Sequence, residues 1–421
     1  MIVLIFYIVL FLAALAIVSV IRRMMTPTQD FTSLKTVTFG DESAVRPDRA
    51  ASVISVIVIF LIWGAFTGSK LVPLHVPGPF SGETQFTYVA ENAAGDRDEA
   101  TVTVLVHEVG DDPEAPAIDE GDGFAKNDSA TVAKWRTVLI RAVRNDEGQD
   151  VEGYRVVEVD GQPIAPEETV DVADGSITMT AKGSLNFTPS KGMQMEPIWL
   201  PSPEQVVSRF FEIASEGYQN FTLWEHLGWS LLRVIVGFVL GAIVGIPLGY
   251  AMGLSGWFRG WFDPIVEFMR PVPPLALIPL VIIWFGIWET GKIILLFLAA
   301  LWIMIIAARA GVSGVNITKI HAAYSLGASK WQIMRHVIVP NSLPEIFTGA
   351  RVAMGVCWGT VVAAELVAAQ KGAGMMIIAA SKFQLTDIVI MGIVLIGIIG
   401  YSIDILMRKM EVWLVPWKGR A

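Results

Sequence analysis

The feature that most constrains this chain is a recurrence of apolar runs that are too long for a soluble fold. A run of about 18 or more apolar residues is long enough to cross a bilayer as a helix. Only 17% of the residues are charged, whereas soluble domains carry about 25%. The sequence therefore predicts a polytopic α-helical membrane protein with about seven spans, at 2–21, 51–68, 228–253, 268–286, 291–309, 350–369 and 387–407.

The first apolar run has to be distinguished from a cleaved signal peptide. No basic segment precedes it, its apolar core is long, and Arg22 and Arg23 follow the run. A signal peptide has the opposite arrangement, with its positive charge in front of a shorter core. We therefore expect a retained helix that adds an extra span to the chain.

Basic residues in short loops orient a membrane protein, because Lys and Arg accumulate on the cytoplasmic side. With seven spans, the loops 22–50 and 310–349 and the C-terminal tail all fall on one side. All three segments carry Lys and Arg, including Lys35, Arg46, Lys418 and Arg420. We expect this side to be the cytoplasm, which puts the N-terminus outside, the C-terminus inside and residues 69–227 in the periplasm.

The segment between the second and third spans has the pattern of β-structure. Residues 84–107 alternate at period two around a Gly-Asp turn, "GYRVVEVDGQPI" turns at Asp160-Gly161, and "DGSITMTAKGSLNFTPSKG" gives two more short strands. Acidic residues gather in 91–175; they are either solvated turns or calcium ligands, but no spacing matches a known calcium loop. We predict an inserted all-β periplasmic sandwich domain, no metal site and no nucleic-acid partner.

Glycines recur every fourth residue along the third span, at Gly237, Gly241, Gly245, Gly249 and Gly253. On a helix they form one smooth strip that a neighbouring backbone can approach closely. The strip is either tight static packing or a moving or dimerising surface. Prolines in this span and the next one, such as Pro247 and Pro279, predict kinks.

The stretch "HAAYSLGASKWQIMRHVIVP", residues 321–340, interrupts the apolar pattern. Its spacing predicts a short helix that ends at Gly327 and a second helix that starts from Ser329 as N-cap and ends at Pro340. Taken alone, such a pair is typical of amphipathic helices at the membrane surface.

The spacing of Ala322-Ala323, then Gly327, then Val337 and Pro340 resembles the ATPase-docking loop of ABC-importer permeases. The flanking segments "SLLRVIVGFVLGAIVGIPLGYAMG" and "PNSLPEIFTGARVAMGVCWGTVVAAELVAAQKGAGMMI" resemble the branch that imports taurine, aliphatic sulfonates and nitrate. The resemblance covers 51–68 and about 196 to the C-terminus. It implies an ABC importer type I permease core in the bacterial inner membrane.

The resemblance also implies partners. A second copy of the chain would complete a homodimer, a periplasmic substrate-binding protein would deliver the substrate, and an ABC ATPase would dock on loop 315–345. His321 stands where the family has an acidic residue, so a favourable charge at the helix start is missing. The implied docking residues are His321, Ala322, Ala323, Gly327, Ala328, Val337 and Pro340.

The chain contains no GxxxxGK[ST] phosphate-binding loop. We therefore expect ATP to be used by the partner subunit, and no catalytic residue or cofactor in this chain. The expected domains are an extra span with a cytoplasmic linker at 1–50, the first core span at 51–68, the insert at 69–195 and the permease core at 196–421. The insert resembles circularly permuted immunoglobulin-like, cadherin-like repeats.

The branch resemblance implies a small anion as substrate, with taurine or another sulfonate as the first choice. Arg233, Arg270, Arg351 and Glu365 are the ionisable residues in or near core spans that we predict to line the translocation path. The alternative is that the arginines anchor span ends and that Glu365 is a hydrated interfacial carboxylate. Two other classes remain open, a secondary transporter and a membrane-anchored surface or sensory protein.

Overall fold

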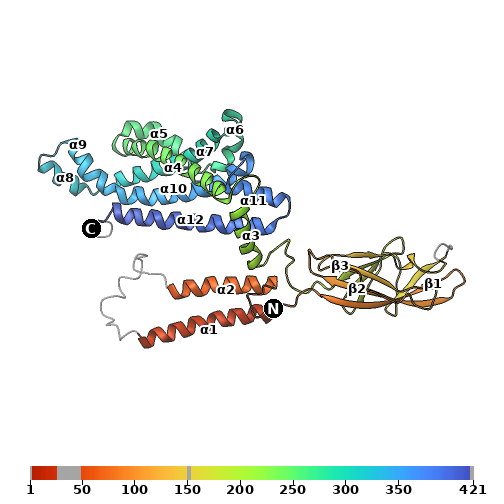
Figure 1. Ribbon diagram of the computed structural model, residues 1–421. Coiled ribbons are helices and arrows are strands. Elements are labelled where there is room, and N and C mark those ends of the chain that lie inside the picture. The colour runs from red at the N-terminus through yellow and green to blue at the C-terminus, as the bar shows by residue number, and fades with distance from the viewer. Residues whose placement is uncertain (1, 26–48, 149–152, 418–421) are drawn as a thin grey trace. The chain divides into compact units, whose positions relative to one another are not determined.

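The computed structural model describes residues 2–25, 49–148 and 153–417. The chain divides into two compact units, Met1–Glu204 and Gln205–Ala421 (Figure 1). The predicted first core span corresponds to α2 and belongs to the first unit. Four of the basic residues used for the orientation, Lys35, Arg46, Lys418 and Arg420, lie outside the described residues.

Helices α1 (Ile2–Met25) and α2 (Arg49–Thr67) are long and apolar enough to cross a membrane. They share a small core around Tyr7 and Ala65, and the Tyr7 hydroxyl donates a 3.0 Å hydrogen bond to the Leu74 carbonyl. Elsewhere on both helices, large apolar side chains such as Val9 and Val56 are exposed. Two apolar helices that bury so little against protein fit a lipid environment.

The rest of the first unit contains two β-sheets. One has the order β3-β2-β1-β5-β6 and the other β4-β9-β8-β7. Buried side chains of both sheets form one hydrophobic cluster, in which the rings of Phe86 and Phe187 stack 5.9 Å apart. The strands are β1 (Gly82–Glu91), β2 (Arg97–His107), β3 (Asp128–Ala133), β4 (Val138–Ile140), β5 (Arg155–Val159), β6 (Gln162–Pro163), β7 (Thr169–Val172), β8 (Gly175–Met179) and β9 (Leu185–Pro189).

The predicted hairpins are confirmed. β1 pairs with β2, β5 with β6 and β8 with β9, all antiparallel. The β5–β6 turn has positive φ at Asp160 (50°) and Gly161 (74°), as a tight hairpin turn requires. The sequence pattern missed β3, β4 and β7, and β3 runs parallel to β2. The circular permutation stays a prediction.

The two linkers of the β-region are hydrogen-bonded to each other and to the end of α2. The Met193 amide donates to the Pro77 carbonyl at 2.7 Å, and the Met195 amide donates to the Phe66 carbonyl at 2.8 Å. The Ser69 hydroxyl donates to Glu204 at 2.6 Å, and such hydrogen bonds keep the pKa of the Glu204 carboxyl below its usual value even though burial opposes this. Hydrogen bonds therefore hold the two linkers of the β-region together and attach them to the end of α2.

The second unit is helical (Figure 1). Its connecting helix α3 (Pro203–Glu216) begins at the boundary between the units. Three helices form most of its core, namely α4 (Leu223–Leu254), α7 (Glu289–Ser313) and α10 (Val339–Ala368). The others are α5 (Gly256–Met269), η3 (Pro274–Leu277), α6 (Ile278–Phe285), α8 (Ile317–Ser325), α9 (Lys330–Ile333), η4 (Met334–Ile338), α11 (Ala373–Lys382) and α12 (Thr386–Leu414).

The glycine strip of α4 packs against α7 of the same chain. A Cβ atom on Gly237 would lie 2.4 Å from Cβ of Leu296, and one on Gly253 would lie 2.8 Å from Cβ of Val312. The strip is therefore an intrachain packing surface, and the dimerising alternative is wrong. Because positions ascend together along both helices, α4 and α7 run parallel.

The span predicted at 268–286 is wrong as a straight helix. Helix α5 follows α4 directly, and η3 with α6 meets α5 at an angle of 93°. Pro271, Pro273 and Pro274 lie at this break, where missing N–H groups and steric clashes prevent a continuous helix. Among the described residues, six other helices are long and apolar enough to span a membrane, and the number rises to seven if the bent pair forms one span. The parallel course of α4 and α7 favours such a return crossing between them.

The helix that starts at Ser329 does not end at Pro340, as we expected from the sequence. It continues through α9 and the π-helical η4 into α10, so that one apolar helical stretch runs from Lys330 to Leu366. Pro340 is the second residue of α10, directly after the π-helical η4. The wider π turn just before it relieves the clash that a proline causes inside a regular helix.

Candidate functional site

Residues 316–340, which include the stretch that interrupts the apolar pattern, form a capped helical hairpin at one end of the second unit. Asn316 caps α8 by accepting a 2.9 Å hydrogen bond from the Thr318 amide. Ser329 and Gln332 form a capping box for α9, with bonds of 2.8 Å and 3.4 Å. The sequence around each break therefore satisfies the orphan backbone groups locally.

Gly327 makes the turn between α8 and α9. Its φ is 78°, in the left-handed region that side chains rarely adopt, and no atom lies within 4 Å of where a Cβ would be. The backbone conformation, and not crowding, requires glycine at this position. This agrees with the break predicted from the sequence.

The hairpin exposes large apolar side chains instead of burying them. Leu326 is 88% exposed, Trp331 71% and Tyr324 50%. Beside them lies an open groove of about 350 Å³, whose walls are Ala323, Leu326, Gly327, Ala328, Gln332, Ile333, His336 and Val337. Exposed apolar side chains next to a groove mark a surface for another protein.

Four of the seven docking residues predicted from the sequence line this groove: Ala323, Gly327, Ala328 and Val337. The other three lie outside it. His321 and Ala322 are exposed on α8, and the Pro340 carbonyl accepts a 3.1 Å hydrogen bond from the Trp417 indole.

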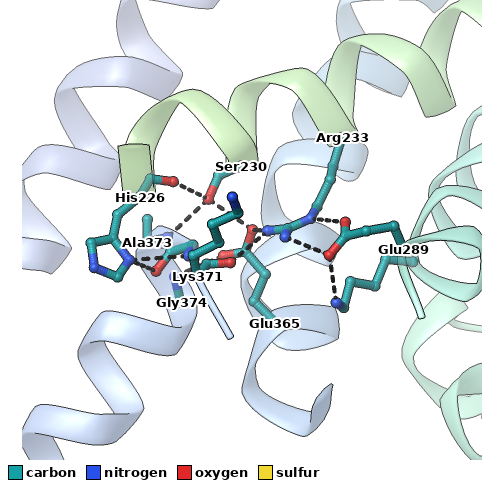
Figure 2. Close-up of polar contacts among 10 residues, drawn as sticks. His226, Ser230, Arg233, Glu289, Glu365, Lys371, Ala373 and Gly374 are labelled. Atoms are coloured by element: carbon teal, nitrogen blue, oxygen red, sulfur yellow. Dashed lines mark hydrogen bonds and ion pairs between the residues drawn. The ribbon is translucent and has the colours of Figure 1, made fainter. Parts of the chain in front are cut away.

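The opposite end of α4, α7 and α10 holds a buried cluster of charges (Figure 2). Arg233 on α4 is 1% exposed. Its Nε and Nη2 donate to the two carboxylate oxygens of Glu289 on α7, at 2.6 Å and 2.8 Å. Its Nη1 donates to Glu365 on α10 at 2.6 Å. A guanidinium matches this pattern because its donors form a rigid planar fork.

Glu365 is also 1% exposed and has further donors around it. The Ser230 hydroxyl donates to it at 2.7 Å and the Gly374 amide at 2.9 Å. A Cβ on Gly372 would lie 2.4 Å from the Glu365 carboxyl carbon, so only glycine fits there. The turn before α11 is therefore built around this carboxylate.

His226 connects the start of α4 to the same turn. Its Nε2 lies 3.1 Å from the Tyr218 carbonyl, and its Nδ1 lies 3.1 Å from both the amide nitrogen and the carbonyl oxygen of Gly372. Lys371 lies 4.0 Å from the centre of the Trp229 ring, in a cation–π contact on the same turn.

Lys292 donates to Glu289 at 2.9 Å, so Arg233 and Lys292 both pair with this carboxylate. Lys371 brings a third cation, which lies over the Trp229 ring. The cluster joins α4, α7, α10 and the turn before α11. The alternative of a hydrated Glu365 and a span-anchoring Arg233 is wrong, because both side chains are buried and paired. Their place in a translocation path stays a prediction.

Sequence reasoning missed Ser230, Glu289 and Lys292 as members of this cluster. Glu289 and Lys292 lie three residues apart in the first turn of α7, and that spacing pairs charges on a helix. This signal was present in the sequence. The turn that surrounds Glu365 had no such signal, because it depends on long-range contacts.

The other two predicted arginines lie in different surroundings. Arg351 is 29% exposed and contacts Asp404 at 3.3 Å and Glu411 at 3.7 Å, which joins α10 to α12. Arg270 is 63% exposed, and its contact to Glu267 is 3.9 Å long. The structure therefore does not bring Arg233, Arg270 and Arg351 together in one site.

Several acidic residues of the β-region have partners inside it. Asp146 accepts hydrogen bonds from the Tyr88 and Tyr154 hydroxyls at 3.0 Å and 2.8 Å. Burial beside Asp146 raises the pKa of Asp128 to about 7, and Asp128 Oδ2 has no hydrogen-bond partner among the described residues. Within residues 2–25, 49–148 and 153–417, no three His, Cys, Asp or Glu side chains are grouped as metal ligands.

Comparisons with known proteins agree on the second unit. Residues 223–414, from the first residue of α4 to the last of α12, match the family "Binding-protein-dependent transport system inner membrane component". One solved structure, "Inward facing conformations of the MetNI methionine ABC transporter", is similar at 19% identity with a TM-score of 0.39. It covers 48% of this chain and 96% of that one, and at this level we draw nothing from it.

Two curated relatives from Escherichia coli (strain K12) are much more similar. The "Taurine transport system permease protein TauC" is 43% identical over 260 residues, which is 62% of this chain and 93% of the relative. The "Putative aliphatic sulfonates transport permease protein SsuC" is 40% identical over 216 residues, 51% of this chain and 81% of the relative. The chain therefore belongs to the family of binding-protein-dependent transport system inner membrane components.

Proposed function

We propose that this chain is the transmembrane permease subunit of an ATP-driven importer for a small sulfonate, with taurine as the first substrate to test. The observation that carries the proposal is the 43% identity to the taurine permease over 93% of that protein. The family match at residues 223–414 covers the helices that hold the paired charges and the exposed hairpin. A secondary transporter or a surface or sensory protein is not favoured, because the family is one of transport components.

A separate ABC ATPase supplies the energy in this proposal and docks on the hairpin 316–340. The exposed Leu326 and Trp331 and the groove beside them support this assignment, because a protein partner would bury them. ATP-driven closure of the ATPase would move α8 and α9. Because α9 continues through η4 into α10, that motion is transmitted into a spanning helix and rocks the pathway between its two open states.

The proposed arrangement has the hairpin in the cytoplasm and residues 69–227 in the periplasm. Seven crossings then put the N-terminus outside and the C-terminus inside. A periplasmic binding protein delivers the substrate, and a second copy of the chain completes the pathway. Cysteines at Ser81 and Ser129 test the orientation, since both should react with an impermeant thiol reagent added from the periplasmic side; reaction from the cytoplasmic side alone would reverse it.

The predicted path residues have unequal support in this proposal. Arg233, Glu365 and Arg351 already have partners of opposite charge, so binding an anion would require breaking those pairs. Arg270 is exposed and only loosely paired. We therefore assign the first contact with the anion inside the spans to Arg270.

The test is uptake of labelled taurine by vesicles that carry the permease, its ATPase and its binding protein. We expect uptake that depends on ATP and on the binding protein. No uptake of taurine together with clear uptake of a solute that lacks a sulfonate would refute the substrate and leave the importer assignment intact. Retained uptake in vesicles without the ATPase would refute the ATP-driven mechanism.

A further inference from the structure

A cavity of about 430 Å³ lies between η3, α7 and α10 of the second unit, and it is separate from the charge cluster and from the hairpin groove. Its walls are mostly apolar, from residues such as Ile306 and Val352. Two ionisable residues of opposite sign line it, Arg270 and Glu345. Both side chains are exposed, Arg270 at the break after α5 and Glu345 on α10, so their charges are free to meet a solute in the cavity.

The polar groups of this cavity have spare binding capacity. Arg270 is 63% exposed, and its guanidinium lies 3.9 Å from the Glu267 carboxylate. Glu267 itself also pairs with Arg309 at 3.1 Å. Among the residues that the structure describes, Glu345 makes no ion pair, and the indole N–H of Trp302 in the cavity wall donates no hydrogen bond.

We propose that this cavity is a transit site for a small zwitterion that carries both an acidic oxyanion and an ammonium group. The Arg270 guanidinium and the Trp302 indole donate to the sulfonate, and the Glu345 carboxylate accepts from the ammonium group. A site for a simple anion would be weakened by a nearby carboxylate, whereas a zwitterion gains from both charges. The inference rests on the proposed function and narrows it to amino-substituted sulfonates.

The test uses the permease assembled with its ATPase in nanodiscs, without the binding protein. Thr348 lines the cavity and is exposed, so Thr348→Cys places a thiol at the site. The native Cys357 is fully buried and should not compete for the reagent. The readout is the rate of reaction with N-ethylmaleimide, an uncharged reagent, in the presence of taurine or of ethanesulfonate, which lacks the amine.

We expect taurine to slow the modification of Thr348→Cys and ethanesulfonate to slow it much less. In Thr348→Cys/Glu345→Gln, protection by taurine should weaken about tenfold, towards that by ethanesulfonate, since a hydrogen bond to a charged group is lost. In Thr348→Cys/Arg270→Gln, both compounds should lose protection. The matched control is Ser402→Cys, an exposed position on α12 whose hydroxyl, like that of Thr348, bonds to the carbonyl four residues back; taurine should not protect it.

Several outcomes would overturn the proposal. Equal protection by taurine and ethanesulfonate would remove the role of Glu345, and no protection by either compound would remove the site. If phosphatidylethanolamine nanodiscs slow the reaction and phosphatidylglycerol nanodiscs do not, with no effect of taurine, the ligand is a lipid headgroup. Since wild-type taurine uptake is measured separately, uptake without protection would reject this site and keep the proposed function.

Discussion

The two ends of the helical unit differ in how their side chains are satisfied: one end buries paired charges, and the other exposes apolar side chains. At one end of α4, α7 and α10, Arg233 and Glu365 are buried, and every donor and acceptor described above meets another within the chain. At the other end, the α8–α9 hairpin keeps Leu326 and Trp331 in solvent. The charge cluster is complete in a single chain, whereas the hairpin has an apolar surface that only another protein would cover.

This contrast suggests how motion can be transmitted. The charge cluster holds three helices and the turn before α11 at fixed distances from one another. The hairpin is joined to α7 through residues 314–316 and to α10 through η4, and some of its side chains, such as Ile333, pack into the core of these helices. A force applied at the hairpin would therefore move helices whose far ends are held together, which favours rocking over separation.

The largest expected effect comes from breaking the charge cluster. Arg233→Met leaves Glu365 buried without its cation, and an uncompensated buried charge destabilises a protein by about 3–5 kcal/mol. We expect the purified permease to lose most of its resistance to thermal aggregation in detergent, measured by size-exclusion chromatography after heating. The docked ATPase should be lost only as a consequence.

The matched control for this change is Arg351→Met. Arg351 also contacts two carboxylates, but its side chain is 29% exposed, and solvent-screened pairs contribute about 1 kcal/mol or less. We expect a small change in thermal resistance. Equal losses for Arg233→Met and Arg351→Met would mean that burial does not distinguish the two sites.

The hairpin should respond in the opposite way. Leu326→Asp replaces an exposed apolar side chain with a charge, so the permease should fold normally. Central interface residues contribute about 2 kcal/mol or more, so the ATPase should bind about thirtyfold more weakly, measured by co-purification and by ATPase activity in vesicles. Gly327→Pro, which is incompatible with the φ of 78°, should abolish transport as well. Normal ATPase binding in both variants would exclude the hairpin as the docking site.

A smaller effect is expected midway between the two ends. Gly241→Val introduces a Cβ that would lie 2.7 Å from Cβ of Ala300, and overpacking of this kind destabilises by about 1–3 kcal/mol. We expect a moderate loss of thermal resistance and a slower transport cycle. Gly355→Ala on α10 is the control, because nothing lies within 4 Å of its added Cβ; a loss in this variant would show that the packing argument is wrong.

The sequence predicted most of what depends on local pattern. Apolar length located the spans, Gly327 and Ser329 located the hairpin breaks, and alternation located the β1–β2 hairpin. The errors occurred where the local structure depends on contacts with residues distant in the sequence. Pro340 appeared to end a helix, because the sequence does not reveal the π turn that accommodates it. The 268–286 segment appeared to be one straight helix, because a hydropathy pattern does not show where the helix axis changes direction.

The candidate sites also differ in whether local sequence pattern or long-range contacts determine them. The docking residues were predicted from spacing in one stretch of the chain, and four of them line one groove. Span-end anchors could not be told from a buried pair at Arg233 and Glu365, because Ser230 and Gly374 lie 135 and 9 residues away from Glu365. A single sequence without long-range contacts does not specify such an environment.

Asp128 in the β-region shows a related contrast between a buried carboxylate that has hydrogen-bond donors and one that lacks them. Glu365 has donors on both oxygens, whereas Asp128 Oδ2 is buried without a partner in the described part of the chain. Burial, with Asp146 nearby, raises the pKa of Asp128 from 3.8 to about 7. The folded state therefore holds this proton more tightly than the unfolded state does.

The consequence is a pH dependence with a definite sign. Between about pH 4 and pH 7 the folded β-region binds more protons than the unfolded one, so its free energy of unfolding falls as the pH rises. The destabilisation caused by ionising the buried Asp128 is absent below this window and fully present above it. In Asp128→Asn the side chain stays neutral, so we expect the variant to resist protease to a higher temperature than the wild type at pH 8 and to differ little from it near pH 4. Limited proteolysis of residues 69–195 in the full-length protein, at a series of temperatures and at both pH values, measures this. A difference between the variant and the wild type that is the same at both pH values would show that Asp128 does not titrate in this window.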